Sequence, residues 1–280
     1  MSGRLRPATP EDRPLAIALG LAEDAAWSGA EPVSEEEAGE FVDSYEPGVV
    51  FELDGRATGY AGTREGGGSL LLADPAHALP ALEALVAWLG ERGHRRIESY
   101  ERDTERIAWL EAHGFRHLYS AFDLNRDVDP PPPAAEWPEG VELARYDPAA
   151  DAEAAHALIY VDAAWAEVPG HVDRSLEKWQ AGMAGYHAWV ARRDGRPVGI
   201  VAARVFEDGR GWVEQLAVAR TARGQGLGRA LLLHSLDELA GLGATSLALG
   251  VQGANETAIR LYRGVGFRVD RAWRSYALPD

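Results

Sequence analysis

Four consecutive prolines, Pro130 to Pro133, divide the 280-residue chain into two segments. Polyproline prefers an extended helix without internal hydrogen bonds, so this run predicts a stiff spacer between folded parts. Each flanking segment has the length of an ordinary domain. We therefore expect a first domain over residues 1–126, a proline-rich linker over 127–140 and a second domain over 141–280.

The two segments repeat one order of predicted elements. Each begins with a strand and a helix, and each contains two strands joined by an Asp-Gly pair, at Asp54-Gly55 and at Asp194-Gly195. Asp-Gly between apolar runs is a strong hairpin signal. Each segment also ends on a Gly-Phe pair that opens a last strand. This recurrence predicts a tandem duplication of one domain and not a solenoid of short repeats.

Hydrophobic periodicity and capping residues place these elements. In the first segment we expect strands at 5–8, 49–53, 58–62, 69–72 and from Phe115, and helices from Pro10, at 78–91 and at 107–113. In the second segment we expect strands at 141–145, 187–191, 198–205, 212–218, 246–251 and from Phe267, and helices at 149–165, 173–184, 226–240 and 256–265.

Composition narrows the class of protein. The chain has no cysteine, which excludes disulfides and thiolate chemistry, and its eight histidines show no metal-ligand spacing. The formal charge is −16, with 27 acidic and 12 basic side chains in residues 1–140 against 17 and 16 in residues 141–280. Such a surface disfavours nucleic acid and suits a cationic substrate, or simply keeps the protein soluble. Without a signal-peptide core or a run of about 18 apolar residues, we expect a cytoplasmic protein with no membrane contact.

A strand, a glycine-rich loop and a helix follow one another without a break between Trp212 and Ala230. Glycines let the backbone adopt positive φ and approach a ligand closely, and the N–H groups that open the next helix hold phosphate. A dinucleotide-binding loop would need a third glycine where Arg229 stands, and a P-loop would need Gly-Lys-Ser/Thr, which is missing. The segment therefore predicts a phosphate loop of another kind.

The motif Arg223-x-x-Gly226-x-Gly228 resembles the acyl-CoA pyrophosphate loop of the GCN5-related N-acetyltransferases, the GNAT family. Downstream, residues 255–267 are similar to that family's Asn-x-x-Ala-x-x-Leu-Tyr-x-x-x-Gly-Phe signature. Two motifs in the right order and about thirty residues apart are specific. The resemblance covers residues 141–280 and implies an α/β fold of two tandem domains, each a mixed, mostly antiparallel central sheet flanked by helices.

The resemblance also implies acetyl-CoA as the cofactor and assigns the residues that bind it. Outward amides of a splayed strand would pair with the pantetheine arm like an added strand, and the loop would hold the pyrophosphate. Asn255 would cap its helix and meet the arm, and Ala258 would leave room for it. The expected cofactor-binding residues are Leu216, Ala217, Val218, Arg223, Gly224, Gln225, Gly226, Leu227, Gly228, Arg229, Asn255, Ala258 and Tyr262.

Acyl transfer to an amine needs a base near the nitrogen, an oxyanion donor and an acid for the leaving thiolate. Tyr262 matches the family's thiol-facing tyrosine and is the expected acid, and a backbone amide of residues 216–218 is the expected oxyanion donor. Glu214 is the expected base or attracting charge, because strand alternation would put it on one face with Trp212, Leu216 and Val218. Several family members carry the glutamate at the position of Trp212. Tyr262 could instead be a core tyrosine, and Glu214 a solvated charge.

We expect the acceptor to bind between the first strand and the hairpin of the second segment. Carboxylates mixed with aromatic side chains suit a cationic amine or a sugar, although helix packing explains the aromatics equally well. The expected substrate-binding residues are Asp162, Trp165, Glu167, Trp212 and Glu214.

The first segment resembles the same fold without its site. Asp74 and Pro75 follow the strand at 69–72, where the loop should be, and Asp74 would repel a phosphate. The signature recurs from Trp109 to Phe115 with Leu110-Glu111 in place of Leu-Tyr, so the acid-bearing tyrosine is lost. We expect a degenerate domain without a pyrophosphate loop, which supports the fold or shapes the substrate site.

The sequence thus predicts an acetyl-CoA-dependent N-acetyltransferase, active in its second domain. The expected acceptor is a primary amine of a small polar, cationic molecule, such as an antibiotic or a biosynthetic intermediate. The layout is similar to that of mycothiol synthases and actinomycete antibiotic acetyltransferases, so a cysteinyl pseudodisaccharide is an alternative acceptor. A protein N-terminus and a CoA-binding sensor without turnover are further alternatives. We expect a monomer or homodimer and no metal.

Overall fold

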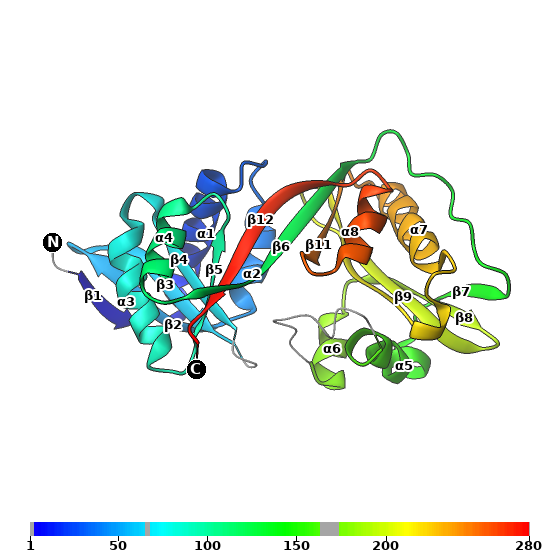
Figure 1. The fold of residues 1–280 in the computed structure, drawn as a ribbon, viewed down its shortest axis with the longest axis horizontal. Helices are drawn as coiled ribbons and strands as arrows, with labels where there is room; N and C mark the ends of the chain where they lie inside the picture. Colours follow the sequence, from blue (N-terminus) through cyan, green and yellow to red (C-terminus); the bar gives the residue numbers. More distant parts are fainter. Residues whose placement is uncertain (1–2, 65–67, 163–173, 280) are drawn as a thin grey trace. The chain divides into compact units, whose positions relative to one another are not determined.

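The computed structural model describes residues 3–64, 68–162 and 174–279, and the chain divides into two compact units (Figure 1). Unit 1 comprises Met1–Phe122 and Asp270–Asp280, and unit 2 comprises Asp123–Val269. These units differ from the expected ranges 1–126 and 141–280, because the last strand of the chain runs back into unit 1.

Unit 1 contains two elements that periodicity did not predict, the short acidic helix α2 and the strand β5. Its elements are β1 (Gly3–Pro7), η1 (Pro10–Asp12), α1 (Arg13–Trp27), α2 (Glu35–Asp43), β2 (Glu46–Leu53), β3 (Arg56–Thr63), β4 (Ser69–Ala73), η2 (Pro75–His77), α3 (Ala78–Gly90), β5 (Arg96–Tyr100) and α4 (Thr104–Ala112). Two long strands, β6 (Arg116–Asp127) and β12 (Arg268–Ala277), have residues in both units.

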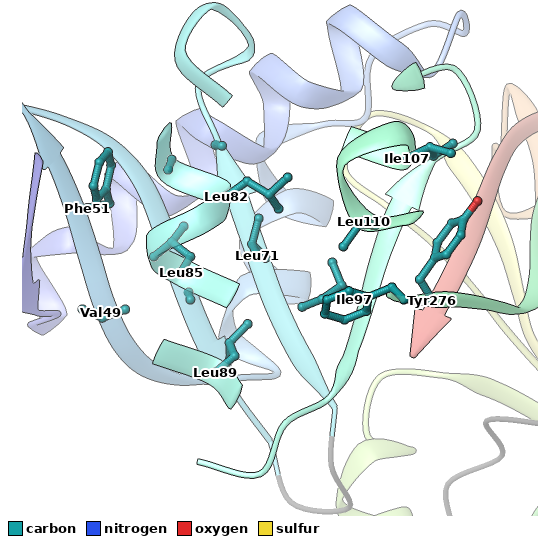
Figure 2. Packing of buried hydrophobic residues seen from close by; sticks show 14 of the residues in the cluster. Val49, Phe51, Leu71, Leu82, Leu85, Leu89, Ile97, Ile107, Leu110 and Tyr276 are labelled. Carbon is teal, nitrogen blue, oxygen red and sulfur yellow. The ribbon is translucent and has the colours of Figure 1, made fainter. Parts of the chain in front are cut away.

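The antiparallel sheet of unit 1, in the order β1-β2-β3-β4, buries both of its faces. Alternation along β2 sends Val49 and Phe51 into one cluster with α3 and α4, and Val50 into another with α1 and α2. Figure 2 shows the first cluster, in which Tyr276 of β12 packs beside Ile97 and the α4 helix. Strand β12 pairs antiparallel with β5, so the end of the chain completes this core.

Unit 2 follows the predicted order, with most bounds within a few residues of expectation. Its elements are β7 (Val141–Arg145), α5 (Pro148–Tyr160), α6 (Leu176–Gly182), β8 (His187–Arg193), β9 (Arg196–Val205), β10 (Arg210–Val218), η4 (Arg220–Ala222), α7 (Leu227–Gly241), β11 (Ser246–Gln252) and α8 (Glu256–Arg263). Residues 128–140 contain no helix or strand and belong to unit 2.

Helix α7 packs directly on the sheet of unit 2, whose strands run in the order β11-β10-β9-β8-β7. The contact depends on Gly199 in β9, where an added Cβ would lie 2.8 Å from Leu231 Cδ1. Leu227 and Leu231 are 1% and 0% exposed, and burying each stabilises the fold by about 1.5–3 kcal/mol. This packing fixes the start of α7, and therefore the loop before it, against β9 and β10.

The predicted tandem duplication is present in the backbone hydrogen bonds. Asp74 donates its N–H to Thr58 O at 2.9 Å, and Ala219 donates its N–H to Val198 O at 2.9 Å. The acceptor in each case is the third residue of the strand that follows the Asp-Gly turn. The aspartate of each turn has a positive φ, which is +48° for Asp54 in unit 1 and +51° for Asp194 in unit 2. The two units therefore share one strand register.

The same comparison corrects one sequence alignment. Phe115 donates its N–H to Leu110 O at 3.0 Å, as Phe267 does to Tyr262 O at 3.1 Å. Leu110, and not Glu111, therefore stands at the position of Tyr262, because the turn before the phenylalanine closes on the same residue in both units. The inference that unit 1 lacks the tyrosine is unchanged.

None of the helices in the described part of the chain has the length and apolar composition of a membrane span.

Candidate active site

Strand β10 separates from β11 halfway along its length. The parallel ladder between them ends at Val213↔Leu249. The antiparallel ladder between β10 and β9 continues to Val218↔Gly199. The second half of β10 is therefore paired with β9 alone along the described ladders.

This open edge presents backbone donors. Because Ala219 donates to Val198 O on β9, alternation along the antiparallel pair turns the N–H groups of Val218 and Leu216 away from β9. An extended ligand can pair with such outward groups as an added strand does.

A β-bulge at Glu214 lies where the two strands separate. Val213 pairs with Ala203 and Gln215 pairs with Ala202, so Glu214 is the extra residue of β10. A bulge bends its strand and increases the local twist. The sequence gives no signal of it, because bulges depend on how two strands pair.

The bulge overturns the prediction that Trp212, Glu214, Leu216 and Val218 share one face of the strand. The extra residue shifts the alternation, so Trp212 shares its face with Gln215, and Leu216 and Val218 point to the opposite face. The contacts of Glu214 must therefore be taken from the structure and not from strand periodicity.

Glu214 is exposed, and its carboxylate accepts a hydrogen bond from Trp212 Nε1 at 2.8 Å. The Trp212 ring lies 4.9 Å from the Arg210 guanidinium on the same strand. The indole fixes the direction of the carboxylate beside the bulge. A negative charge held against an aromatic ring is a suitable neighbour for a cationic amine.

Sequence reasoning missed a second polar contact on this strand. Trp179 of α6, 1% exposed, donates Nε1–H to Gln215 Oε1 at 2.9 Å. The hydrogen bond ties α6 to the bulged part of β10. Trp179 fits an ordinary helix-packing pattern, and Gln215 reaches this face only because of the bulge, so no local signal could have paired them.

The glycine-rich loop has the conformation that its sequence predicted. Gly224 has φ +74° and Gly226 has φ +87°, and a Cβ at either residue would meet no atom within 4 Å. Glycine is needed there for backbone conformation and not for lack of space. Helix α7 starts at Leu227, so the first N–H groups of the helix, which lack intrahelical partners, border this open loop.

Side chains tether the other residues of the loop. Gln225 donates to Thr221 O at 3.1 Å, and Arg229 donates to Gly264 O at 3.4 Å. At Gly228 an added Cβ would lie 3.6 Å from Val218 Cγ2, an ordinary contact distance. Gly228 therefore faces the end of β10, and its φ does not require glycine.

Asp162, which follows α5, holds the loop before α7. Its carboxylate accepts from Arg220 N at 3.2 Å and lies 3.6 Å from Arg220 Nε. Its carbonyl accepts from the Arg223 guanidinium, which also donates to Val218 O at 3.0 Å. These contacts of Asp162 and Arg223 lie within the protein and fix the path from β10 into the loop.

Helix α8 carries the second motif, and the first residue of that motif caps the helix. Asn255 accepts from Ala258 N at 3.2 Å, which confirms it as the N-cap. Tyr262 is 8% exposed, and its ring meets the Phe267 ring edge-on at a centroid distance of 6.2 Å. Burial raises the pKa of Tyr262 to about 12. Its hydroxyl is therefore protonated at neutral pH and can act as a proton donor.

Two of the expected acceptor-binding residues, Trp165 and Glu167, lie outside the described residues. Among the residues that are described, no group of three or more His, Asp or Glu side chains could hold a metal ion. What the described part of unit 2 does bring together is an open strand edge, a glycine-rich helix start and a protonated tyrosine.

The open edge and the loop fit acyl-CoA. The outward N–H groups of Leu216 and Val218 suit an extended arm with amide groups, and the loop beside Gly226 suits a pyrophosphate. The two features follow one another directly along the chain, as an extended ligand that ends in a pyrophosphate requires.

Comparison with known proteins gives the same family. Residues 152–267 match the model of the acetyltransferase (GNAT) family. The chain is 31% identical over 194 residues to a mycothiol acetyltransferase of Thermomonospora curvata, a match that covers 66% of this chain and 64% of that protein. The chain thus spans slightly less than two thirds of the length of this relative.

Two solved structures share the fold over nearly the whole chain. A GCN5-related N-acetyltransferase from Sphaerobacter thermophilus has a TM-score of 0.78 and 23% identity, covering 98% of this chain and 94% of that one. A tandem GNAT protein from the clavulanic acid biosynthesis pathway has a TM-score of 0.72 and 15% identity, covering 98% of both chains.

The splayed strand, the glycine-rich loop and the capped helix all lie within the matched residues, and together they define a GNAT domain. Residues 152–267 match the GNAT family, and the chain shares the fold of a tandem GNAT protein over nearly its whole length.

Proposed function

We propose that this chain is an acetyl-CoA-dependent N-acetyltransferase whose second unit carries the site. The observation behind the proposal is the continuity of the open β10 edge with the loop at Gly226 and the start of α7. Backbone donors for an extended arm lead directly to N–H groups for a pyrophosphate.

The acetyl thioester supplies the acyl group, and this chain's residues arrange its transfer. The acceptor amine attacks in its deprotonated form, so a C–N bond forms as the C–S bond breaks. An outward amide of Leu216 or Val218 stabilises the charge that develops on the carbonyl oxygen. Tyr262, whose hydroxyl stays protonated at neutral pH because burial raises its pKa, gives its proton to the departing sulfur.

Glu214 attracts the amine and accepts its proton, directly or through a water. Its carboxylate is exposed and is oriented by the indole of Trp212 at 2.8 Å. An exposed carboxylate beside an aromatic ring favours a small, polar, cationic acceptor. Asp162, expected to bind substrate, holds the loop through Arg220, and we assign it that positioning role.

A second candidate acceptor is the cysteinyl pseudodisaccharide that gives mycothiol. The likeness to a protein named mycothiol acetyltransferase favours it. Its primary amine would need the same deprotonation and the same proton donor, so the two candidates differ in the acceptor and not in the chemistry.

The test is thiol release from acetyl-CoA against a panel of acceptors. The panel holds aminoglycosides, basic peptide antibiotics, polyamines, the mycothiol precursor and peptides with free N-termini. We expect turnover with one class of small amine. Turnover with N-terminal peptides alone would contradict the small-molecule proposal, and CoA binding without turnover of any acceptor would indicate a sensor.

A pair of glycine variants shows whether the loop carries the activity. Gly226→Asp places a side chain and a negative charge in the loop, and it should abolish turnover and CoA binding. Gly243→Asp is the matched control, because Gly243 has φ +92° and equally open surroundings beyond the other end of α7. Equal losses in the two variants would place the effect in folding and contradict the assignment.

A further inference from the structure

The shared register of the two units makes their positions comparable residue by residue. Since Asp74 bonds to Thr58 as Ala219 bonds to Val198, the preceding residue Ala73 is the counterpart of Val218. The N–H of Ala73 therefore points outward from the edge of β4, as that of its counterpart does from β10.

The helices after these strands correspond in the same way. Asp103 caps α4 by accepting from Arg106 N at 3.0 Å, as Asn255 caps α8 by accepting from Ala258 N at 3.2 Å. Arg106 in unit 1 thus occupies the position of Ala258 in unit 2. A long cationic side chain stands where the other unit has a methyl group.

In unit 1 the outward amide is bonded to the protein itself. Ala73 N donates to Glu23 Oε1 at 2.8 Å, and Glu23, on α1, is only 3% exposed. The Arg106 guanidinium, also 3% exposed, pairs with the same carboxylate and lies 3.1 Å from a carboxylate oxygen of Asp103. A buried ionic network therefore joins α1, β4 and α4 at this point.

The position of the phosphate loop is also filled. The Asp74 carboxylate accepts from Ala76 N at 3.0 Å, at the start of η2 and just before α3. Arg56 and His77 lie 3.2 and 3.3 Å from the same carboxylate. A side-chain anion thus meets the backbone N–H where the other unit has an open glycine-rich loop.

We propose that Glu23, Arg106 and Asp74 occupy in unit 1 the positions that acyl-CoA takes in unit 2. The protein's own carboxylates replace the pantetheine arm and the phosphate, so unit 1 is closed to the cofactor. Opening it would separate Glu23 from Arg106 and leave buried charges unpaired, which is strongly unfavourable. Each chain therefore binds one equivalent of acyl-CoA, a statement that rests on the proposed function of unit 2.

Calorimetric titration of the full chain with CoA tests the stoichiometry. We expect one site per chain in the wild type and none in Gly226→Asp, with one site retained in Gly243→Asp. Two wild-type sites, or one site surviving in Gly226→Asp, would overturn the closure of unit 1 and leave the proposed function intact. If the wild type bound no CoA, the proposed function would be overturned. The comparison of the two units, on which the closure of unit 1 rests, would then fail as well.

Amide hydrogen exchange of the folded wild type gives a readout at single positions. We expect the Val218 amide to exchange fast without CoA and at least tenfold more slowly with it. The Ala73 amide should be slow without CoA and unchanged by it, and Glu23→Ala should speed it. Slowing of the Ala73 amide by CoA in the wild type would refute the proposal even if the variant fails to fold.

Discussion

At the residue scale, burial keeps the hydroxyl of Tyr262 protonated over the pH range in which an acetyltransferase would work. Burial raises the pKa of Tyr262 to about 12, so the acid form persists wherever the enzyme would work. Activity should then rise with pH as the acceptor amine deprotonates, and it should show no falling limb below about pH 10.

Tyr262→Phe removes the proton donor and leaves the ring in place. We expect kcat to fall by about 10²-fold, because general acid catalysis contributes at least that much, with little change in KM for acetyl-CoA. Steady-state rates between pH 6 and 10 measure this. Tyr276→Phe, at another buried tyrosine, should keep wild-type kcat, and an equally active Tyr262→Phe would remove Tyr262 from the mechanism.

A substitution at Asp162 distinguishes two roles for this residue, which are holding the glycine-rich loop and binding the acceptor. If it holds the loop through Arg220, Asp162→Asn should raise KM for acetyl-CoA by about tenfold, the loss of roughly one charged hydrogen bond, without changing KM for the amine. Glu238→Gln is the control, since it also removes a half-buried carboxylate paired with an arginine of unit 2. A rise confined to the KM for the amine would return Asp162 to substrate binding.

At the scale of elements, local sequence chemistry explains where most helices and strands lie. Side-chain caps start α6 and α8 at Ser175 and Asn255, and of these two caps the sequence predicted the one at Asn255. Alternating apolar residues give the half-buried strands. The bulge at Glu214 escapes such reasoning, because it is a property of the pairing between β9 and β10.

The approach of α7 to β9 depends on one glycine. Gly199→Ala would place a Cβ 2.8 Å from Leu231 Cδ1 in a filled core, and we expect it to lower the free energy of unfolding by about 1–3 kcal/mol. Gly241→Ala, at the open end of the same helix, should be neutral or slightly stabilising. Urea unfolding of both variants measures the difference. Equal free energies of unfolding would contradict the prediction and show that side chains near Gly199 can move to make room for the added methyl group.

At the scale of the whole molecule, unit 1 is built from two segments that are far apart in the sequence. The segment Asp270–Asp280 is distant in sequence from the rest of unit 1 but belongs to it. Within that unit, Arg271 pairs with buried Asp24 at 2.9 Å, and Tyr276 is fully buried beside Leu110 and Ile97. The last strand is therefore part of the core of unit 1.

A chain that ends at Val269 should lose the fold of unit 1. The truncation empties the site of Tyr276 and leaves Asp24 as a buried charge without Arg271, a loss of about 3–5 kcal/mol for the pair alone. Limited proteolysis and peptide-resolved hydrogen exchange should show unit 1 unprotected. A chain that ends at Leu278 is the control, and protection of unit 1 in the chain that ends at Val269 would contradict this account.

Local patterns along the chain were enough to predict the likeness to the GNAT family, the tandem repeat, the glycine-rich loop and the position of Tyr262. These features depend on residues close together in the chain, where φ, capping and periodicity leave few choices. Tertiary structure alone decided the bulge at Glu214, the return of β12 to unit 1 and the pairing of Glu23 with Arg106, 83 residues apart. Burial and strand pairing set these contacts, and both depend on which distant segments pack together.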